Sequence, residues 1–133
     1  MNNEEYQAEK LIFERLDNVI KERMLFKEPN LSRNKLCRLV GLNKNRFGYI
    51  IHKCSGYPNC TAYINSLRMK YASELIAKHP EYKINAIAAE CGIPCISTFN
   101  RVFKEYYRVP PHTFRESVLE KDGQSENTDG QFG

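Results

Sequence analysis

The chain has 133 residues and a formal net charge of +4, and 41% of its residues are hydrophobic and 27% charged. This composition excludes a disordered chain and a membrane span, since no apolar run approaches the roughly 18 residues that a span needs. The length predicts one folded domain. Five cysteines, an odd number, and no recognisable signal peptide predict a reducing cytoplasm.

The first third of the chain predicts one amphipathic helix followed by two short helices. Apolar side chains recur at helical spacing over residues 6–26, and Pro29 ends this pattern. Ser32 can then cap a short helix, which Gly41 can end in a left-handed turn. Asn43 can cap the next helix.

The rest of the chain predicts a long helix from about Thr61 to Lys78, two more short helices separated by Gly92, and a polar tail from Ser117. No segment offers the alternation of a strand, so we predict an all-α fold. The predicted divisions are an N-terminal amphipathic helix (1–28), a first helix-turn-helix unit (29–58), a linker helix (59–80), a second helix-turn-helix unit (81–116) and a disordered polar tail (117–133).

The two pairs of short helices share one pattern of residue sizes. A small residue allows close helix crossing, a glycine four positions later allows a sharp turn, and a large apolar residue follows on the second helix. The two copies are Cys37, Gly41, Phe47 and Ala88, Gly92, Phe99. A linker helix of about 18 residues is roughly 27 Å long, close to the ~34 Å between successive major-groove faces of DNA.

Positive charge is concentrated in the middle of the chain. Residues 29–115 hold 14 basic and 4 acidic side chains, whereas residues 1–28 hold 5 and 7, and residues 116–133 hold 1 and 5. Such a concentration is typical of a module that binds a polyanion, although a solvated basic face has the same composition. Together with two helix-turn-helix units, it favours double-stranded DNA as the partner.

Two sets of residues point to a family. The second unit contains Ile84, Ala86, Ile87, Ala88, Glu90, Cys91, Gly92, Ser97, Thr98, Phe99, Arg101, Val102, Phe103, Lys104, Pro110, Pro111 and Arg115. The linker contains Tyr63, Ile64, Leu67, Arg68, Tyr71 and Ala72. With these residues, the stretch 31–115 resembles the AraC/XylS-type DNA-binding module. It departs from the family at Ile93, where an aromatic residue is usual, at Arg108, where a glycine is usual, and in a longer loop after Gly56.

The resemblance implies two homeodomain-like three-helix units that regulate transcription, by activation rather than repression, through sequence-specific DNA binding at the nucleoid. It implies base contacts by Asn45, Gly48, Tyr49, Ile96, Ser97, Asn100 and Arg101. Phosphate contacts are expected from Lys44, Arg46, Lys53, Thr98 and Lys104. Arg101 is the strongest candidate for base reading, because a guanidinium can bond O6 and N7 of guanine together. A phosphate contact or a surface salt bridge is its alternative role.

Other functions fit the sequence less well. A zinc site could use His52, Cys54, Cys60, Cys91 and Cys95, but these residues include no Cys-x-x-Cys pair. We expect no metal, no cofactor and no enzymatic activity, because the chain has no glycine-rich phosphate loop and no plausible pair of catalytic carboxylates. The serious alternative is a protein-interaction or output module of a larger regulator, without autonomous DNA binding. RNA polymerase and an upstream sensory or dimerisation domain are candidate partners.

Overall fold

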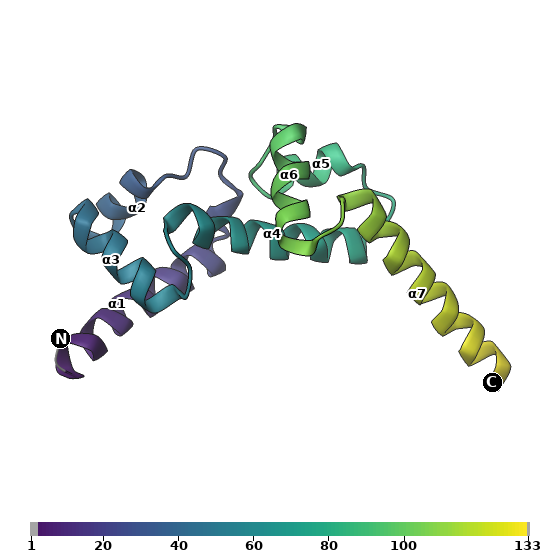
Figure 1. The fold of residues 1–133 in the computed structure, drawn as a ribbon, viewed down its shortest axis with the longest axis horizontal. Helices are drawn as coiled ribbons and strands as arrows, with labels where there is room; N and C mark the ends of the chain where they lie inside the picture. Colours follow the sequence, from purple (N-terminus) through teal and green to yellow (C-terminus); the bar gives the residue numbers. More distant parts are fainter. Residues whose placement is uncertain (1–2, 133) are drawn as a thin grey trace. The chain divides into compact units, whose positions relative to one another are not determined.

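The computed structural model describes the backbone of residues 3–132 and the side chains of residues 3–121, and every regular element within that part is helical (Figure 1). The predicted all-α fold is confirmed. In chain order the elements are α1 (Asn3–Glu22), a 3-10 turn η1 (Leu25–Lys27), α2 (Arg33–Val40), α3 (Lys44–Ser55), α4 (Cys60–Lys78), α5 (Ile84–Glu90), α6 (Ile96–Tyr107) and α7 (Pro111–Phe132). Residues 1, 2 and 133, which the predicted divisions include, lie outside the described residues.

The chain divides into two compact units, and the division falls inside α4, between Arg68 and Met69. The first half of α4 therefore contributes to the core of the first unit, and the second half contributes to the core of the second. The segment 59–80, predicted as a linker, is a structural part of both units.

Capping residues set the ends of the two short helices in the first unit. The Ser32 hydroxyl accepts a hydrogen bond from the backbone N–H of Lys35 at 3.2 Å, at the start of α2. Gly41 ends α2 with φ 72°, in the left-handed region that favours glycine. Asn43 Oδ1 accepts from the backbone N–H of Arg46 at 2.8 Å, at the start of α3. All three capping predictions are confirmed.

The core of the first unit draws side chains from five elements. Its buried hydrophobic residues are Leu16, Ile20, Phe26, Leu36, Cys37, Phe47, Ile50, Ile51, Cys60, Tyr63 and Ile64. Arg68 is buried beside them: its Nε donates to the Phe26 carbonyl at 2.7 Å and its Nη2 to the Glu28 carbonyl at 2.8 Å. Because one guanidinium donates to two carbonyls, Arg68 ties α4 to η1 and to the residue that follows it.

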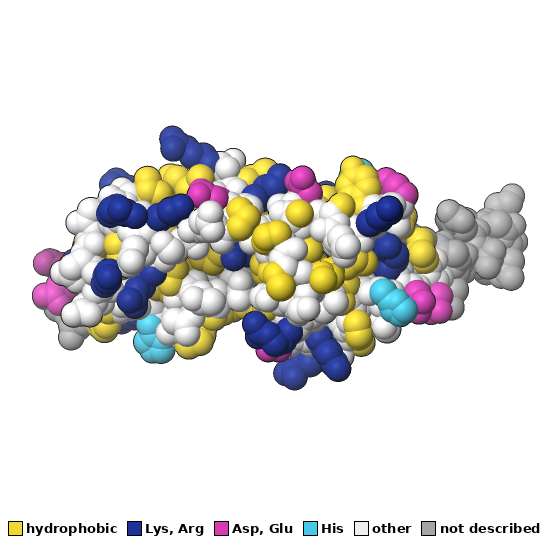
Figure 2. All heavy atoms as spheres, turned by 90° about the horizontal axis from the view of Figure 1, so that it is seen from above, with side chains coloured by type: hydrophobic (Ala, Val, Ile, Leu, Met, Phe, Trp, Pro, Cys, Tyr) yellow, Lys and Arg dark blue, Asp and Glu magenta, His cyan; other side chains and the backbone are white. Residues whose placement is uncertain are grey.

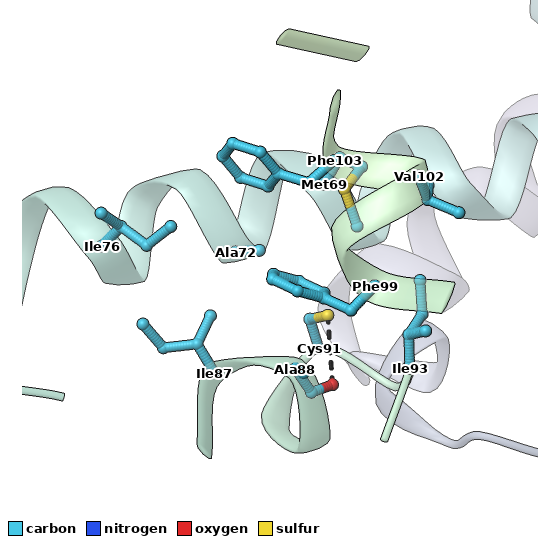
Figure 3. Packing of buried hydrophobic residues seen from close by; sticks show 10 residues of the cluster. All are labelled: Met69, Ala72, Ile76, Ile87, Ala88, Cys91, Ile93, Phe99, Val102 and Phe103. Atoms are coloured by element: carbon cyan, nitrogen blue, oxygen red, sulfur yellow. Dashed lines mark hydrogen bonds between the residues drawn. The ribbon is translucent and has the colours of Figure 1, made fainter. Parts of the chain in front are cut away.

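The core of the second unit surrounds Phe99 (Figure 3). Its buried residues are Met69, Ala72 and Ile76 from α4, Ile87, Ala88 and Cys91 from α5 and the turn after it, Ile93, and Phe99, Val102 and Phe103 from α6. In Figure 3 the Phe99 ring lies between Ala72 and Cys91, where small side chains leave room for it. The Cys91 thiol donates to the Ala88 carbonyl at 3.3 Å. The predicted small, glycine, large pattern thus describes the packing of this unit.

Two departures from the family pattern have different structural consequences. Ile93 is 7% exposed and packs within the core, so an aliphatic side chain fills the place of the usual aromatic one. Arg108 ends α6 with φ 68° and ψ 1°, a left-handed conformation that costs a non-glycine residue free energy. The family's usual glycine would adopt this conformation without strain.

Helix α7 runs from Pro111 to Phe132 and so includes residues 117–132, for which the composition predicts a polar tail. Pro111 occupies the first position of α7, where its missing N–H costs nothing. Phe114 anchors the first turns, with its ring 5.5 Å from that of Phe103 between centroids. Glu120, a good helix former, follows in the next turns. The disordered polar tail over 117–133 stays a prediction.

Candidate nucleic-acid interface

Helix α3 has one apolar and one polar face. Phe47 and Ile50 are each 1% exposed and Ile51 is fully buried, which confirms the assignment of Phe47 and Ile50 to the core. The opposite side is exposed and carries the predicted contact residues Lys44, Asn45, Arg46, Tyr49 and Lys53. The polar face of α3 is therefore accessible to a macromolecular ligand.

Gly48 lies half-buried on α3 between these exposed side chains. No atom lies within 4 Å of the position that a Cβ would occupy there. Neighbouring atoms therefore do not require a glycine at this position. The missing side chain instead allows another molecule to approach the α3 backbone closely.

Lys53 is held by two tyrosines. Its Nζ donates to the Tyr49 hydroxyl at 3.3 Å, and it lies 5.5 Å from the Tyr49 ring centroid and 5.4 Å from that of Tyr6. Exposed cation–π contacts contribute about 0.5–1 kcal/mol each. A phosphate contact by Lys53 must therefore compete with contacts that reach back to α1.

The first turns of α1 share a hollow with α3. This hollow has a volume of about 570 Å³ and is lined by Glu5, Ala8, Glu9, Asn45, Arg46 and Tyr49. Three predicted DNA contacts thus lie beside two carboxylates that the sequence analysis did not identify. The spacing of four residues between Glu5 and Glu9 places them on one face of α1, but it does not indicate which helix that face meets.

Helix α6 repeats the division of faces in the second unit. Phe99 and Phe103 are fully buried and Val102 is 3% exposed, as predicted. Ser97, Asn100, Arg101 and Lys104 are exposed, and Ile96 and Thr98 are half-buried. A hollow of about 530 Å³ is lined by Ile84, Asn85, Ile96, Asn100, Arg101, Lys104, Pro110, Pro111 and His112. It brings together four predicted contact residues and adds Asn85 and His112, which had no sequence signal of their own.

Arg101 forms a surface ion pair with Glu105. Its Nη1 lies 3.2 Å from Glu105 Oε1, and the two side chains are 64% and 59% exposed. Exposed pairs at this helical spacing contribute only about 0.3–0.5 kcal/mol. The salt bridge considered as an alternative is present, but it is too weak to keep Arg101 from a stronger partner.

Cys95 is the N-cap residue of α6 and is exposed. The Thr98 hydroxyl lowers the pKa of the Cys95 thiol, and the backbone N–H groups of Thr98 and Ser97 act in the same direction. In the first unit, by contrast, burial raises the pKa of Cys60 to about 11. Of these two thiols, Cys95 is therefore the more reactive.

Charged side chains cover much of the surface. Figure 2 shows Lys and Arg side chains along the whole of this face, with acidic side chains in several places between and beside them. Within the part of the chain that the structure describes, no helix has the length and apolar character to cross a membrane. The same residues include no cluster of three or more His, Cys, Asp or Glu side chains suited to a metal ion.

Comparison with known proteins identifies the family. A family model described as a helix-turn-helix domain matches residues 36–117, which is more than half of the chain. The regulatory protein PocR of Salmonella typhimurium is 32% identical over 81 residues, or 61% of this chain. The chain spans only 26% of the length of PocR.

Two solved structures have the same fold. The C-terminal domain of the two-component response regulator yesN from Fusobacterium nucleatum superposes with a TM-score of 0.70 at 24% identity, covering 77% of this chain and 95% of that domain. The C-terminal domain of AraT, a response regulator from Geobacillus stearothermophilus, gives 0.73 at 22% identity, covering 80% and 84%. The chain belongs to the AraC/XylS-type helix-turn-helix family of DNA-binding transcription regulators.

Proposed function

We propose that this chain binds double-stranded DNA sequence-specifically and activates transcription, with α3 and α6 in successive major grooves. One observation carries the proposal: α3 and α6 each bury an apolar face and expose the polar residues that match the family's contact positions. Family membership supports DNA as the partner. Action on DNA places the protein at the nucleoid, in the cytoplasm.

The proposed contacts fall into two classes. Base edges are read by Asn45, Gly48, Tyr49, Ile96, Ser97, Asn100 and Arg101, and phosphates are held by Lys44, Arg46, Lys53, Thr98 and Lys104. Asn85 and His112 extend the second interface, because they line the same hollow as Arg101. Phosphate contacts position the protein, whereas base contacts specify the sequence.

The proposal is tested by titrating a pool of random duplexes of about 25 base pairs with the protein at two salt concentrations and sequencing what is retained. A bipartite motif with half-sites about one helical turn apart, and affinity that falls with salt, would support it. Salt-sensitive retention without enrichment would contradict sequence-specific binding. Absence of retention at both salt concentrations would favour the interaction module instead.

Two substitutions separate base reading from phosphate binding. Arg101→Ala should reduce discrimination against the wrong base by about 1–3 kcal/mol. Lys44→Ala should weaken binding to all sequences alike and reduce the salt slope by about one. Each variant serves as the control of the other. Unchanged discrimination by Arg101→Ala would remove its base-reading role.

Contact with another protein is compatible with DNA binding. RNA polymerase is the partner that activation requires. The similar structures are C-terminal domains of response regulators, which supports an upstream sensory or dimerisation domain as a further partner. A chain that acted only through proteins would show weak, salt-insensitive binding to DNA.

A further inference from the structure

The first turns of α1 border the proposed DNA-reading face of α3. We propose that Glu5 and Glu9 weaken the attraction of this face for DNA phosphates and so favour base contacts over nonspecific binding. The inference rests on the proposed DNA-binding function and adds two residues that determine affinity and specificity.

A hollow between α1 and α3 brings charges of both signs together. Glu5 and Glu9 line it together with Arg46, a proposed phosphate contact, and with Asn45 and Tyr49, two proposed base contacts. Packing of α1 against α3 holds the two carboxylates in this place. Their negative charge therefore acts on the same small region in which Arg46 must attract a phosphate.

Glu9 is fixed there by burial. It is only 5% exposed, and its Oε1 has no hydrogen-bond partner among the described residues. A buried carboxylate oxygen without a partner is costly for stability. An apolar side chain at this position would pack in the first unit without this cost. The presence of a glutamate is therefore consistent with a role outside the core.

A second proposed phosphate-binding cation of α3, Lys53, contacts α1. The Lys53 ammonium lies over the ring of Tyr6, one residue after Glu5, and over the ring of Tyr49. Two of the three proposed phosphate-binding cations of α3, Arg46 and Lys53, thus face the first turns of α1.

The effect on DNA binding depends on the distance over which charges interact in salt solution. Charges interact over a Debye length of about 8 Å at physiological ionic strength, so carboxylates at the rim of the interface repel the nearest phosphates. Phosphate contacts carry no sequence information. A reduction in their strength lowers affinity for every duplex, and a larger share of the remaining affinity comes from base contacts.

The test compares three variants of the full chain by titration with a fluorescent random-sequence duplex of about 25 base pairs. Glu5→Gln/Glu9→Gln removes both charges and keeps the side-chain shapes. Glu22→Gln is the matched control, because it removes one exposed carboxylate from the other end of α1, roughly 25 Å along the helix from Glu5. Glu5→Lys reverses one charge at an exposed position and keeps the Glu9 side chain.

We expect the double variant and Glu5→Lys to bind about three- to tenfold more tightly than wild type at low salt, and the gain to shrink as salt rises. Glu22→Gln should change affinity less than about twofold. If the double variant fails to fold, Glu5→Lys decides the question alone.

Two results would overturn the inference. Equal or weaker binding by the folded Glu5 and Glu9 variants would refute it while leaving the proposed function intact, provided that wild type binds duplex DNA in a salt-dependent way. Wild type that binds no duplex at any salt concentration would instead refute the proposed function, and the inference with it.

Discussion

Replacement of Arg108 by glycine should stabilise the second unit. Arg108 has φ 68° and ψ 1° at the C-terminal end of α6 and is exposed. A left-handed non-glycine residue costs about 1–2 kcal/mol. Glycine removes this cost, but it also makes the unfolded chain more flexible, and this entropy offsets about 0.5–1 kcal/mol of the stability gained. The net gain should be about 0.5–1 kcal/mol in the free energy of unfolding.

For a unit of this size the gain corresponds to an increase in Tm of about 3–6 °C, measurable by scanning calorimetry or by circular dichroism during heating. Arg108→Ala is the matched control, since it removes the same charged side chain but keeps a Cβ in the left-handed conformation. A glycine variant no more stable than the alanine variant would refute the argument that backbone strain is present at this position.

Three further predictions concern single residues. Gly48→Ala should raise the free energy of unfolding by about 0.5–1 kcal/mol, because alanine favours a helix more than glycine does and its methyl group meets open space. The same variant should weaken DNA binding, and unchanged affinity would remove Gly48 from the proposed contacts. Arg68→Leu should lower the free energy of unfolding by about 1–3 kcal/mol in urea titrations, because the Phe26 carbonyl loses its Arg68 donor and the Glu28 carbonyl keeps only the Leu31 N–H; a loss below 0.5 kcal/mol would contradict this role. Cys95 should be the first cysteine that iodoacetamide modifies as pH rises. Its pKa is lowered, so its reactive thiolate forms at a lower pH than that of an ordinary thiol, whereas the raised pKa of Cys60 keeps that thiol protonated. Bound cognate DNA should slow modification of Cys95, and mass spectrometry of peptides would show either result.

The parts of the fold that sequence could predict depend on short-range interactions. Ser32, Gly41 and Asn43 act on groups within three or four residues of themselves, so their roles can be read from spacing alone. Arg68 bonds to carbonyls 42 and 40 residues away, and no local pattern indicates such partners. The division of the chain inside α4 is also a tertiary property, because periodicity identifies an apolar face and not the core that it enters.

The same limit applies to the candidate site. Helical spacing correctly placed Asn45, Tyr49 and Arg101 on outer faces, because direction around a helix is local geometry. The acidic neighbours of α3 and the contact of Lys53 with Tyr6 depend on the path of α1 across α3. Both follow from tertiary packing, which no local pattern in the sequence specifies.

Counting basic residues therefore overstates the charge available to DNA. Residues 29–115 hold 14 basic side chains, but Arg68 is buried and Lys35 pairs with Glu28 at 3.0 Å. The four proposed phosphate-binding cations predict a slope of log affinity against log salt of about −3.6, at −0.9 for each phosphate neutralised. If all 14 contributed, the slope would be about −13. A slope of −3 to −4 in a salt titration would support binding through the outer faces of α3 and α6. A slope steeper than about −8 would mean that the basic surface as a whole binds DNA. It would refute the assignment of phosphate contacts to the four proposed cations.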